Sequence, residues 1–115
     1  VSVGGMIVGG VSPVLRSGAQ PGDLLYVTGQ IGGSFESGWH LRFDPRLEVG
    51  AWASKTKAHA MMDLSDGLGR DAHRIAVASG VRIELDAAKL PISHRCGTWQ
   101  QAVSEGEDYE LLIAL

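Results

Sequence analysis

The chain has 115 residues, enough for one domain with a modest hydrophobic core. The net charge is −3 and the pI is near 5.7, so the chain has no excess of basic residues and nucleic acid is not expected as a partner. One cysteine cannot form an internal disulfide and fits a reducing, cytoplasmic location. Residues 1–15 are too short and too interrupted to span a bilayer, so no membrane association is expected.

The first half of the chain is rich in glycine. Its expected elements are a strand over residues 2–11, a connector over 13–23, a short strand over 24–28, a loop or weak helix over 30–38, and a helix over 44–55. The last begins at Asp44 followed by proline, which is the pattern of an N-cap with proline at the first helical position.

The second half alternates apolar and polar segments. Its expected elements are a strand over 58–64, a helix over 66–78 closed by Gly80, a half-buried strand over 81–85, an irregular stretch over 90–96, a short helix over 98–104 and a final strand over 109–115. Alternation of strands and helices predicts an α+β or α/β layered sheet.

The most informative segment joins an expected strand to an expected helix. Asp63 and Asp66 stand three apart across a tight bend, with Ser65 between them and Gly67 after them. Carboxylate oxygens suit Mg²⁺, and the free N–H groups of a helix N-terminus suit a phosphate. The same residues are also compatible with plain helix capping by Ser65 or Asp66 and no chemistry at all.

A second acidic segment comes about forty residues later. It holds four carboxylates in six residues, namely Glu105, Glu107, Asp108 and Glu110, directly before the final apolar run. Like charges are costly to gather without a cation or a cationic ligand. A solvated acidic loop is the alternative interpretation.

Together these segments resemble thiamine-monophosphate kinases, of the aminoimidazole ribonucleotide synthetase superfamily. The resemblance rests on the two acidic motifs, Asp63-Leu-Ser-Asp-Gly-Leu68 and Gly106-Glu-Asp-Tyr-Glu-Leu111, and on three further segments in the same order, Arg16-Ser-Gly-Ala19, Pro21-Gly-Asp-Leu-Leu-Tyr-Val-Thr-Gly29, and Ala78-Ser-Gly-Val81 leading to Leu90-Pro91. It covers nearly the whole chain. One departure is Glu105, where the family usually has glycine, which questions the fit of the substrate.

The resemblance implies a role for five residues. Asp63 and Asp66 match positions that bind magnesium, and Ser65 and Arg16 match positions that contact ATP. Glu107 matches a position that contacts thiamine monophosphate. The residues alone favour the alternative for Arg16, a solvated linker arginine.

The resemblance also implies a fold and an organisation. It implies a mixed β-sheet flanked by helices, with residues 1–20 as the end of an N-terminal domain and linker, and residues 21–115 as part of the C-terminal domain. The family's complete kinases are cytoplasmic homodimers with most metal-binding aspartates in the other domain, so this chain alone is expected to be inactive. Two alternatives stay open: another ATP-using member of the superfamily, and a non-catalytic remnant serving as a binding or assembly module.

Overall fold

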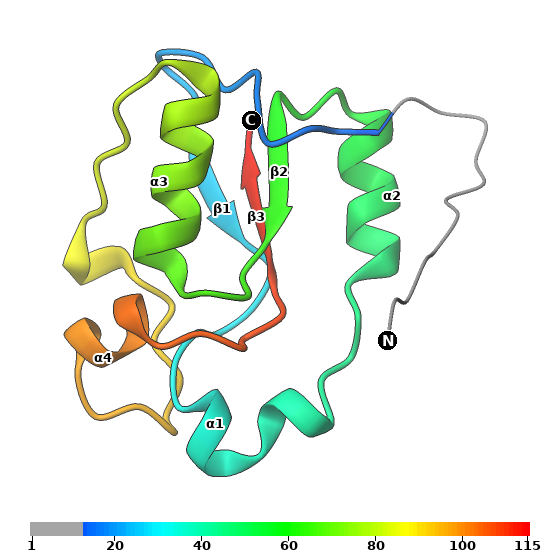
Figure 1. Ribbon diagram of the computed structural model, residues 1–115. Coiled ribbons are helices and arrows are strands. Elements are labelled where there is room, and N and C mark those ends of the chain that lie inside the picture. Colours follow the sequence, from blue (N-terminus) through cyan, green and yellow to red (C-terminus); the bar gives the residue numbers. More distant parts are fainter. Residues whose placement is uncertain (1–12) are drawn as a thin grey trace, which may run out of the picture.

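The computed structural model describes residues 13–115, so the strand expected over 2–11 lies outside the described residues. Its centre is a three-stranded antiparallel sheet in the order β1-β3-β2 (Figure 1). The strands are β1 (Leu25–Val27), β2 (Ala60–Asp63) and β3 (Leu111–Ala114). Each strand is one or two residues shorter at each end than the sequence predicts.

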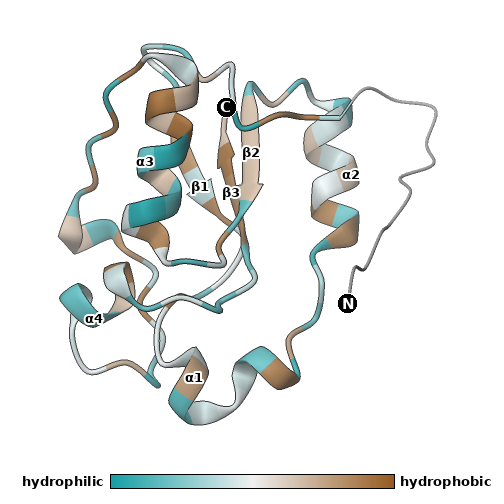
Figure 2. Cartoon of the chain, viewed as in Figure 1, coloured by the Kyte–Doolittle hydropathy of each residue, from teal (hydrophilic) through white to brown (hydrophobic). Residues whose placement is uncertain are grey.

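One long helix covers each face of the sheet, which gives three layers (Figure 1). Successive β3 residues point to opposite faces: Leu112 belongs to the core cluster beneath α3 (Leu68–Ser79), whereas Ile113 packs with Ala53 of α2 (Leu47–Lys55). The central strand β3 is hydrophobic along its length, while α3 carries alternating hydrophobic and hydrophilic bands (Figure 2). The expected α+β fold with a sheet flanked by helices is confirmed.

Short helices occupy the connections between these layers. They are α1 (Ser34–Ser37), α4 (Trp99–Ser104), and two 3₁₀ turns at Trp39–Leu41 and Ala87–Lys89. The prediction of a short helix over 98–104 is confirmed, and the Thr98 side chain caps it by accepting a hydrogen bond from the N–H of Gln101 at 3.1 Å. Within residues 13–115 no helix has both the length and the apolar character that crossing a bilayer requires.

Helix α3 ends as predicted but begins two residues later. Gly80 adopts a left-handed conformation (φ 67°) and closes the helix. At the other end the N-cap is Gly67, and no side chain caps it, so the interpretation of Ser65 or Asp66 as the capping residue is wrong. Asp71 instead reaches back one turn, and its carboxylate accepts a hydrogen bond from the N–H of Asp66 at 3.0 Å.

Helix α2 also begins later than Asp44. Its N-cap is Arg46, at φ −79° and ψ 50°, and the preceding Pro45 carbonyl accepts a hydrogen bond from Leu47. The Arg46 guanidinium binds Glu110, as described below. The predicted N-cap at Asp44 is therefore wrong, and the residue in the N-cap position, Arg46, instead makes a long-range contact.

The strand expected over residues 81–85 is absent from the described sheet. Val81 and Ile83 do pack against the main core while Arg82 and Glu84 are exposed, so the alternation is real. The Val81 N–H, however, is bound to the Ala76 carbonyl at the end of α3. The alternation at residues 81–85 therefore arises because alternate side chains pack on the core, although this segment forms no backbone hydrogen bonds with a strand of the described sheet.

Candidate functional site

Two loops, residues 64–67 and 105–109, meet at one edge of the sheet, beside the start of α3. Three backbone hydrogen bonds join them: Glu107 N–H to the Ser65 carbonyl (2.9 Å), Tyr109 N–H to the Leu64 carbonyl (2.9 Å), and Leu64 N–H to the Glu110 carbonyl (2.8 Å). These are the two acidic segments of the sequence. The fold thus places them side by side, and we refer to them below as the paired loops.

Glycines permit this close approach. A Cβ atom on Gly106 would lie 2.5 Å from the Ser65 carbonyl oxygen, and one on Gly67 (φ 98°) would lie 2.9 Å from the Glu105 carbonyl oxygen. The tight contact therefore falls at Gly106 and not at Glu105, whose backbone is extended. The Glu105 carboxylate turns to the N–H of Gly33 at 2.8 Å. The side chain that departs from the family pattern is accommodated here.

Asp63 and Asp66 both lie on the first of the paired loops or directly before it. Asp63 is the last residue of β2 and is exposed. Asp66 is half-exposed, and its carboxylate pairs with Arg74 of α3 at 2.5 Å. Arg74 also binds the fully buried Asp71 at 2.7 Å. Hydrogen bonding to Asp66 raises the pKa of Arg74, so this cation stays charged beside the loop.

The start of α3 faces the same loop with unused donors. The first N–H groups of any α-helix have no intrahelical partner, and no side chain of residues 13–115 caps those of α3. Together with the helix dipole, they favour an anion at the position just after Asp66. Carboxylates for a cation and N–H groups for an anion therefore occur at one place.

The second of the paired loops has a strained backbone. Glu107 (φ 65°) and Tyr109 (φ 52°) both adopt left-handed conformations, which cost non-glycine residues about 1–3 kcal/mol each. Such conformations persist where the surrounding structure holds them, and they gather at functional sites. In the described part of the chain, the Glu107 carboxylate has no hydrogen-bond or ion-pair partner, so it is available to a ligand.

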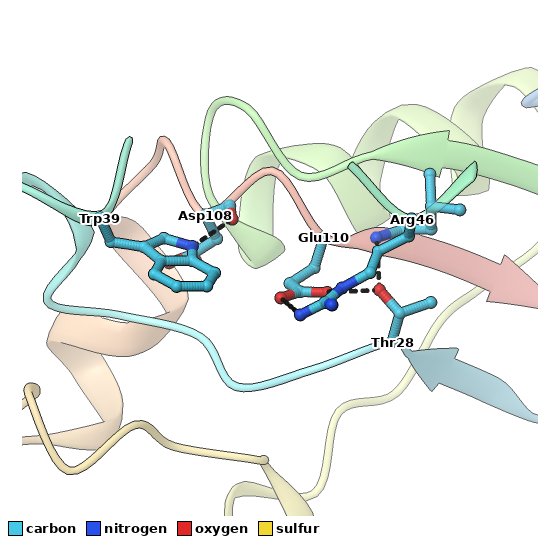
Figure 3. A network of polar contacts seen from close by, with 6 residues as sticks. Thr28, Trp39, Arg46, Asp108 and Glu110 are labelled. Carbon is cyan, nitrogen blue, oxygen red and sulfur yellow. Dashed lines mark hydrogen bonds and ion pairs between the residues drawn. The ribbon is translucent and has the colours of Figure 1, made fainter. Parts of the chain in front are cut away.

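Three of the four acidic side chains in this segment, all but Glu107, already accept hydrogen bonds from the protein. Glu110 is 2% exposed and receives two hydrogen bonds from Arg46, both at 2.8 Å, and one from Thr28 at 2.5 Å (Figure 3). Burial alone would raise the pKa of Glu110, but the hydrogen bonds from Arg46 and Thr28 lower it overall. The expectation that four clustered carboxylates require a cation is thus too simple.

Asp108 is fully buried between the loop and the turn that precedes α1. Its Oδ1 atom accepts hydrogen bonds from the Gly32 N–H (2.9 Å) and the Ser34 hydroxyl (2.5 Å). Its Oδ2 atom has no partner among the described residues. Burial raises the pKa of Asp108, against the lowering effect of the Ser34 and Gly32 hydrogen bonds. Trp39 completes the contact by donating its indole N–H to the Asp108 carbonyl at 3.0 Å (Figure 3).

Not every predicted residue reaches the paired loops. Asp63, Ser65, Asp66 and Glu107 come together there. Arg16 is exposed, and its carbonyl contacts Ser79 at the far end of α3, about 17 Å along the helix from its first residue, Leu68. Within residues 13–115 no group of three or more His, Cys, Asp or Glu side chains is placed to hold a metal ion.

Sequence reasoning missed the residues that hold the loops in place. Arg46, Thr28 and Trp39 are 64, 82 and 69 residues from their partners on the loop, so no local pattern reveals them. Trp39 also lies under the Arg95 guanidinium, whose central carbon is 4.7 Å from the ring centroid. Phe43 stacks on Tyr109 of the second paired loop, with ring centroids 4.5 Å apart.

Comparison with known proteins agrees with this architecture. Residues 40–114 match the family described as AIR synthase related protein, C-terminal domain. The chain belongs to this family. The synthase-related fold extends to solved structures: thiamine-monophosphate kinase from Stenotrophomonas maltophilia K279a superposes with a TM-score of 0.77 at 31% identity, over 88% of this chain and 42% of that one.

Two further similarities concern kinases of the same name. The thiamine-monophosphate kinase of Rhodopirellula baltica is 41% identical over 113 residues, covering 90% of this chain and 35% of that protein. A solved complex described as AaThiL with AMPPCP and TMP gives a TM-score of 0.66 at 30% identity, over 88% of this chain and 41% of that one. The chain therefore spans well under half the length of these relatives.

Proposed function

We propose that this chain is part of an ATP-dependent kinase that transfers the γ-phosphoryl group of ATP to thiamine monophosphate, giving the diphosphate. The observation that carries the proposal is the hydrogen bond between Glu107 N–H and the Ser65 carbonyl, at 2.9 Å. It brings an unpaired carboxylate beside the segment that offers Asp63 and Asp66. The similarity to named kinases, one in complex with AMPPCP and TMP, supports it.

Asp63 and Asp66 are the proposed magnesium ligands. Mg²⁺ is usually bound by one or two carboxylates together with waters and substrate phosphates, so a pair without a third protein ligand fits this ion. When bound, the metal would supply neutralisation of the phosphate charge. Asp66 would exchange its contact with Arg74 for this role, leaving Arg74 bound to the buried Asp71.

Ser65 and the start of α3 are proposed to position the nucleotide phosphates. The helix N–H groups and dipole attract an anion, and the Ser65 hydroxyl adds a donor on the same loop. Arg16 is proposed to contact ATP as well, as the family resemblance implies. Its place near Ser79 separates it from the paired loops, so such a contact would require a different part of the nucleotide.

Glu107 is the proposed contact of thiamine monophosphate. The substrate carries a permanently cationic thiazolium ring and an aminopyrimidine with N–H donors, and both are suited to a carboxylate. The strained backbone fixes where this carboxylate stands. The phosphate acceptor needs no strong base, so catalysis rests on in-line positioning and charge neutralisation.

The complete activity is proposed to need more than this chain. The relatives are well over twice as long, and we propose that residues 1–20 lead from another domain and that residues 21–115 form part of the C-terminal one. The cytoplasmic homodimer of the resembling family is proposed for the protein at its natural length. The 115-residue chain alone is expected to show no turnover.

The test is an assay of phosphotransfer from ATP to thiamine monophosphate by the protein at its natural length. Asp66→Asn should lower turnover about a hundredfold or more, because a ligand of the charge-neutralising metal is lost. Its thermal stability should stay nearly unchanged, because Asp66 and Arg74 are both more than 40% exposed. The matched control is Glu84→Gln, which breaks an exposed ion pair with Arg82. Equal turnover in the two variants would refute the assignment.

A further inference from the structure

The segment that holds Glu107 in place comes from far along the chain. Residues 31–39 contribute three donors to Asp108: the Gly32 N–H and the Ser34 hydroxyl to its carboxylate, and the Trp39 indole N–H to its carbonyl. On the other side, the loop is held by the Ser65 and Leu64 carbonyls, described above. The loop is therefore held from both sides around Asp108, which lies between the two left-handed residues Glu107 and Tyr109.

We propose that Asp108 is a positioning residue, acting as a hydrogen-bond acceptor that fixes the left-handed backbone of Glu107 and so sets the place of the substrate-binding carboxylate. The inference rests on the proposed function only for the identity of the substrate. Asp108 adjoins Glu107, and anchoring its side chain and its carbonyl leaves little freedom for the peptide between them.

The geometry favours an acceptor over a metal or substrate ligand. The Asp108 side chain is fully buried, and both hydrogen bonds go to the same oxygen, Oδ1. An amide oxygen can accept the same two bonds, so Asp108→Asn preserves the contact while removing any negative charge. The amide nitrogen would occupy the position of Oδ2, which has no partner among residues 13–115. A ligand role would instead require the carboxylate.

Hydrogen exchange tests the positioning directly. The Glu107 and Tyr109 amides are bonded to the carbonyls of the first loop, so their exchange rates report opening of the clamp. Asp108→Ala should accelerate both about tenfold or more, and Asp108→Asn by about twofold or less, because only the former removes a buried acceptor. The control is Asp86→Ala, which removes an exposed carboxylate that caps a 3₁₀ turn and should leave both rates unchanged.

Two results would overturn the inference: equal acceleration by Asp108→Asn and Asp108→Ala, or no acceleration by either. If Asp108→Ala does not fold, Ser34→Ala takes its place, because it removes one donor and keeps the carboxylate. Unchanged exchange at Glu107 in the folded Ser34→Ala protein would equally contradict the clamp.

A kinetic measurement separates this inference from the proposed function. In the protein at its natural length, Asp108→Ala should raise KM for thiamine monophosphate about tenfold with little change in KM for ATP, and Asp108→Asn should restore it. Absence of kinase activity in the unsubstituted protein, combined with the expected exchange rates, would reject the proposed substrate and leave the positioning role supported. If Asp108→Asn loses kinase activity while the exchange rates of the Glu107 and Tyr109 amides stay unchanged, the positioning role is rejected.

Discussion

The ion pair between Arg46 and Glu110 allows a quantitative test of what holds the paired loops to the rest of the domain. We consider Arg46→Met, which keeps most of the aliphatic volume and removes the guanidinium. Glu110 is 2% exposed, and the variant leaves it only the Thr28 hydroxyl. Removing one partner of a fully buried pair costs about 3–5 kcal/mol. The Arg46 side chain is 28% exposed, so we expect a loss of about 2–3 kcal/mol.

Urea unfolding followed by tryptophan fluorescence measures this loss, with Arg82→Met as the matched control. Arg82 pairs with Glu84 at 2.5 Å, but their side chains are 84% and 75% exposed, so the expected loss is about 0–1 kcal/mol. Equal losses in the two variants would refute the reasoning that burial, and not ion-pair distance, determines the contribution.

The pH dependence of the Arg46→Met loss adds an independent check. In the unsubstituted protein the pKa of Glu110 lies below its ordinary value, so its contribution is present above about pH 4.3 and is lost as pH falls. Without Arg46, burial dominates and the pKa rises, so the variant weakens as pH increases. The difference in unfolding free energy should therefore grow from acid to neutral pH. A difference independent of pH would contradict the assignment to charge.

Three further outcomes follow from the same contacts. Gly106→Ala should destabilise the protein by about 1–3 kcal/mol, because the new Cβ would lie 2.5 Å from the Ser65 carbonyl oxygen. Gly50→Ala, inside helix α2, should instead stabilise it slightly, because the nearest atom to its new Cβ lies 3.5 Å away. Urea unfolding that ranks the two variants in the opposite order would contradict the close approach at Gly106. Burial raises the pKa of Asp108, so the folded state binds its proton more tightly and loses stability as pH rises above about 4. Asp108→Asn should therefore gain stability relative to the unsubstituted protein as pH rises above about 4. A relative loss of stability over the same pH range would contradict a raised pKa for Asp108. Thr98→Ala should lower the unfolding free energy by about 1 kcal/mol through loss of the α4 cap, and no change would show that the cap is dispensable.

The sequence predicts those features that depend on near neighbours. The helix that becomes α3, its terminal glycine and the short helix over 98–104 are predicted from local signals, and the structure confirms all three. The two acidic segments are also visible in the sequence. Their pairing follows from the antiparallel contact of β2 and β3, which no spacing rule gives.

The remaining features depend on distant contacts. Arg46 lies just before α2 and binds Glu110, which is 64 residues away in the sequence. The different roles of the clustered carboxylates are hidden for the same reason. Asp108 and Glu110 accept hydrogen bonds from segments before residue 50, whereas Glu107 has no side-chain partner among residues 13–115. Residue types alone cannot distinguish a structural carboxylate from one that awaits a ligand.

Calorimetric titration of magnesium–AMPPCP and then thiamine monophosphate into the protein at its natural length tests the central claim most directly. We expect Asp66→Asn to weaken nucleotide binding and Glu107→Gln to weaken thiamine monophosphate binding while sparing the nucleotide. Glu84→Gln, in an exposed ion pair, should bind both ligands normally. Unchanged binding of both ligands to Asp66→Asn and Glu107→Gln would show that the paired loops are not the site.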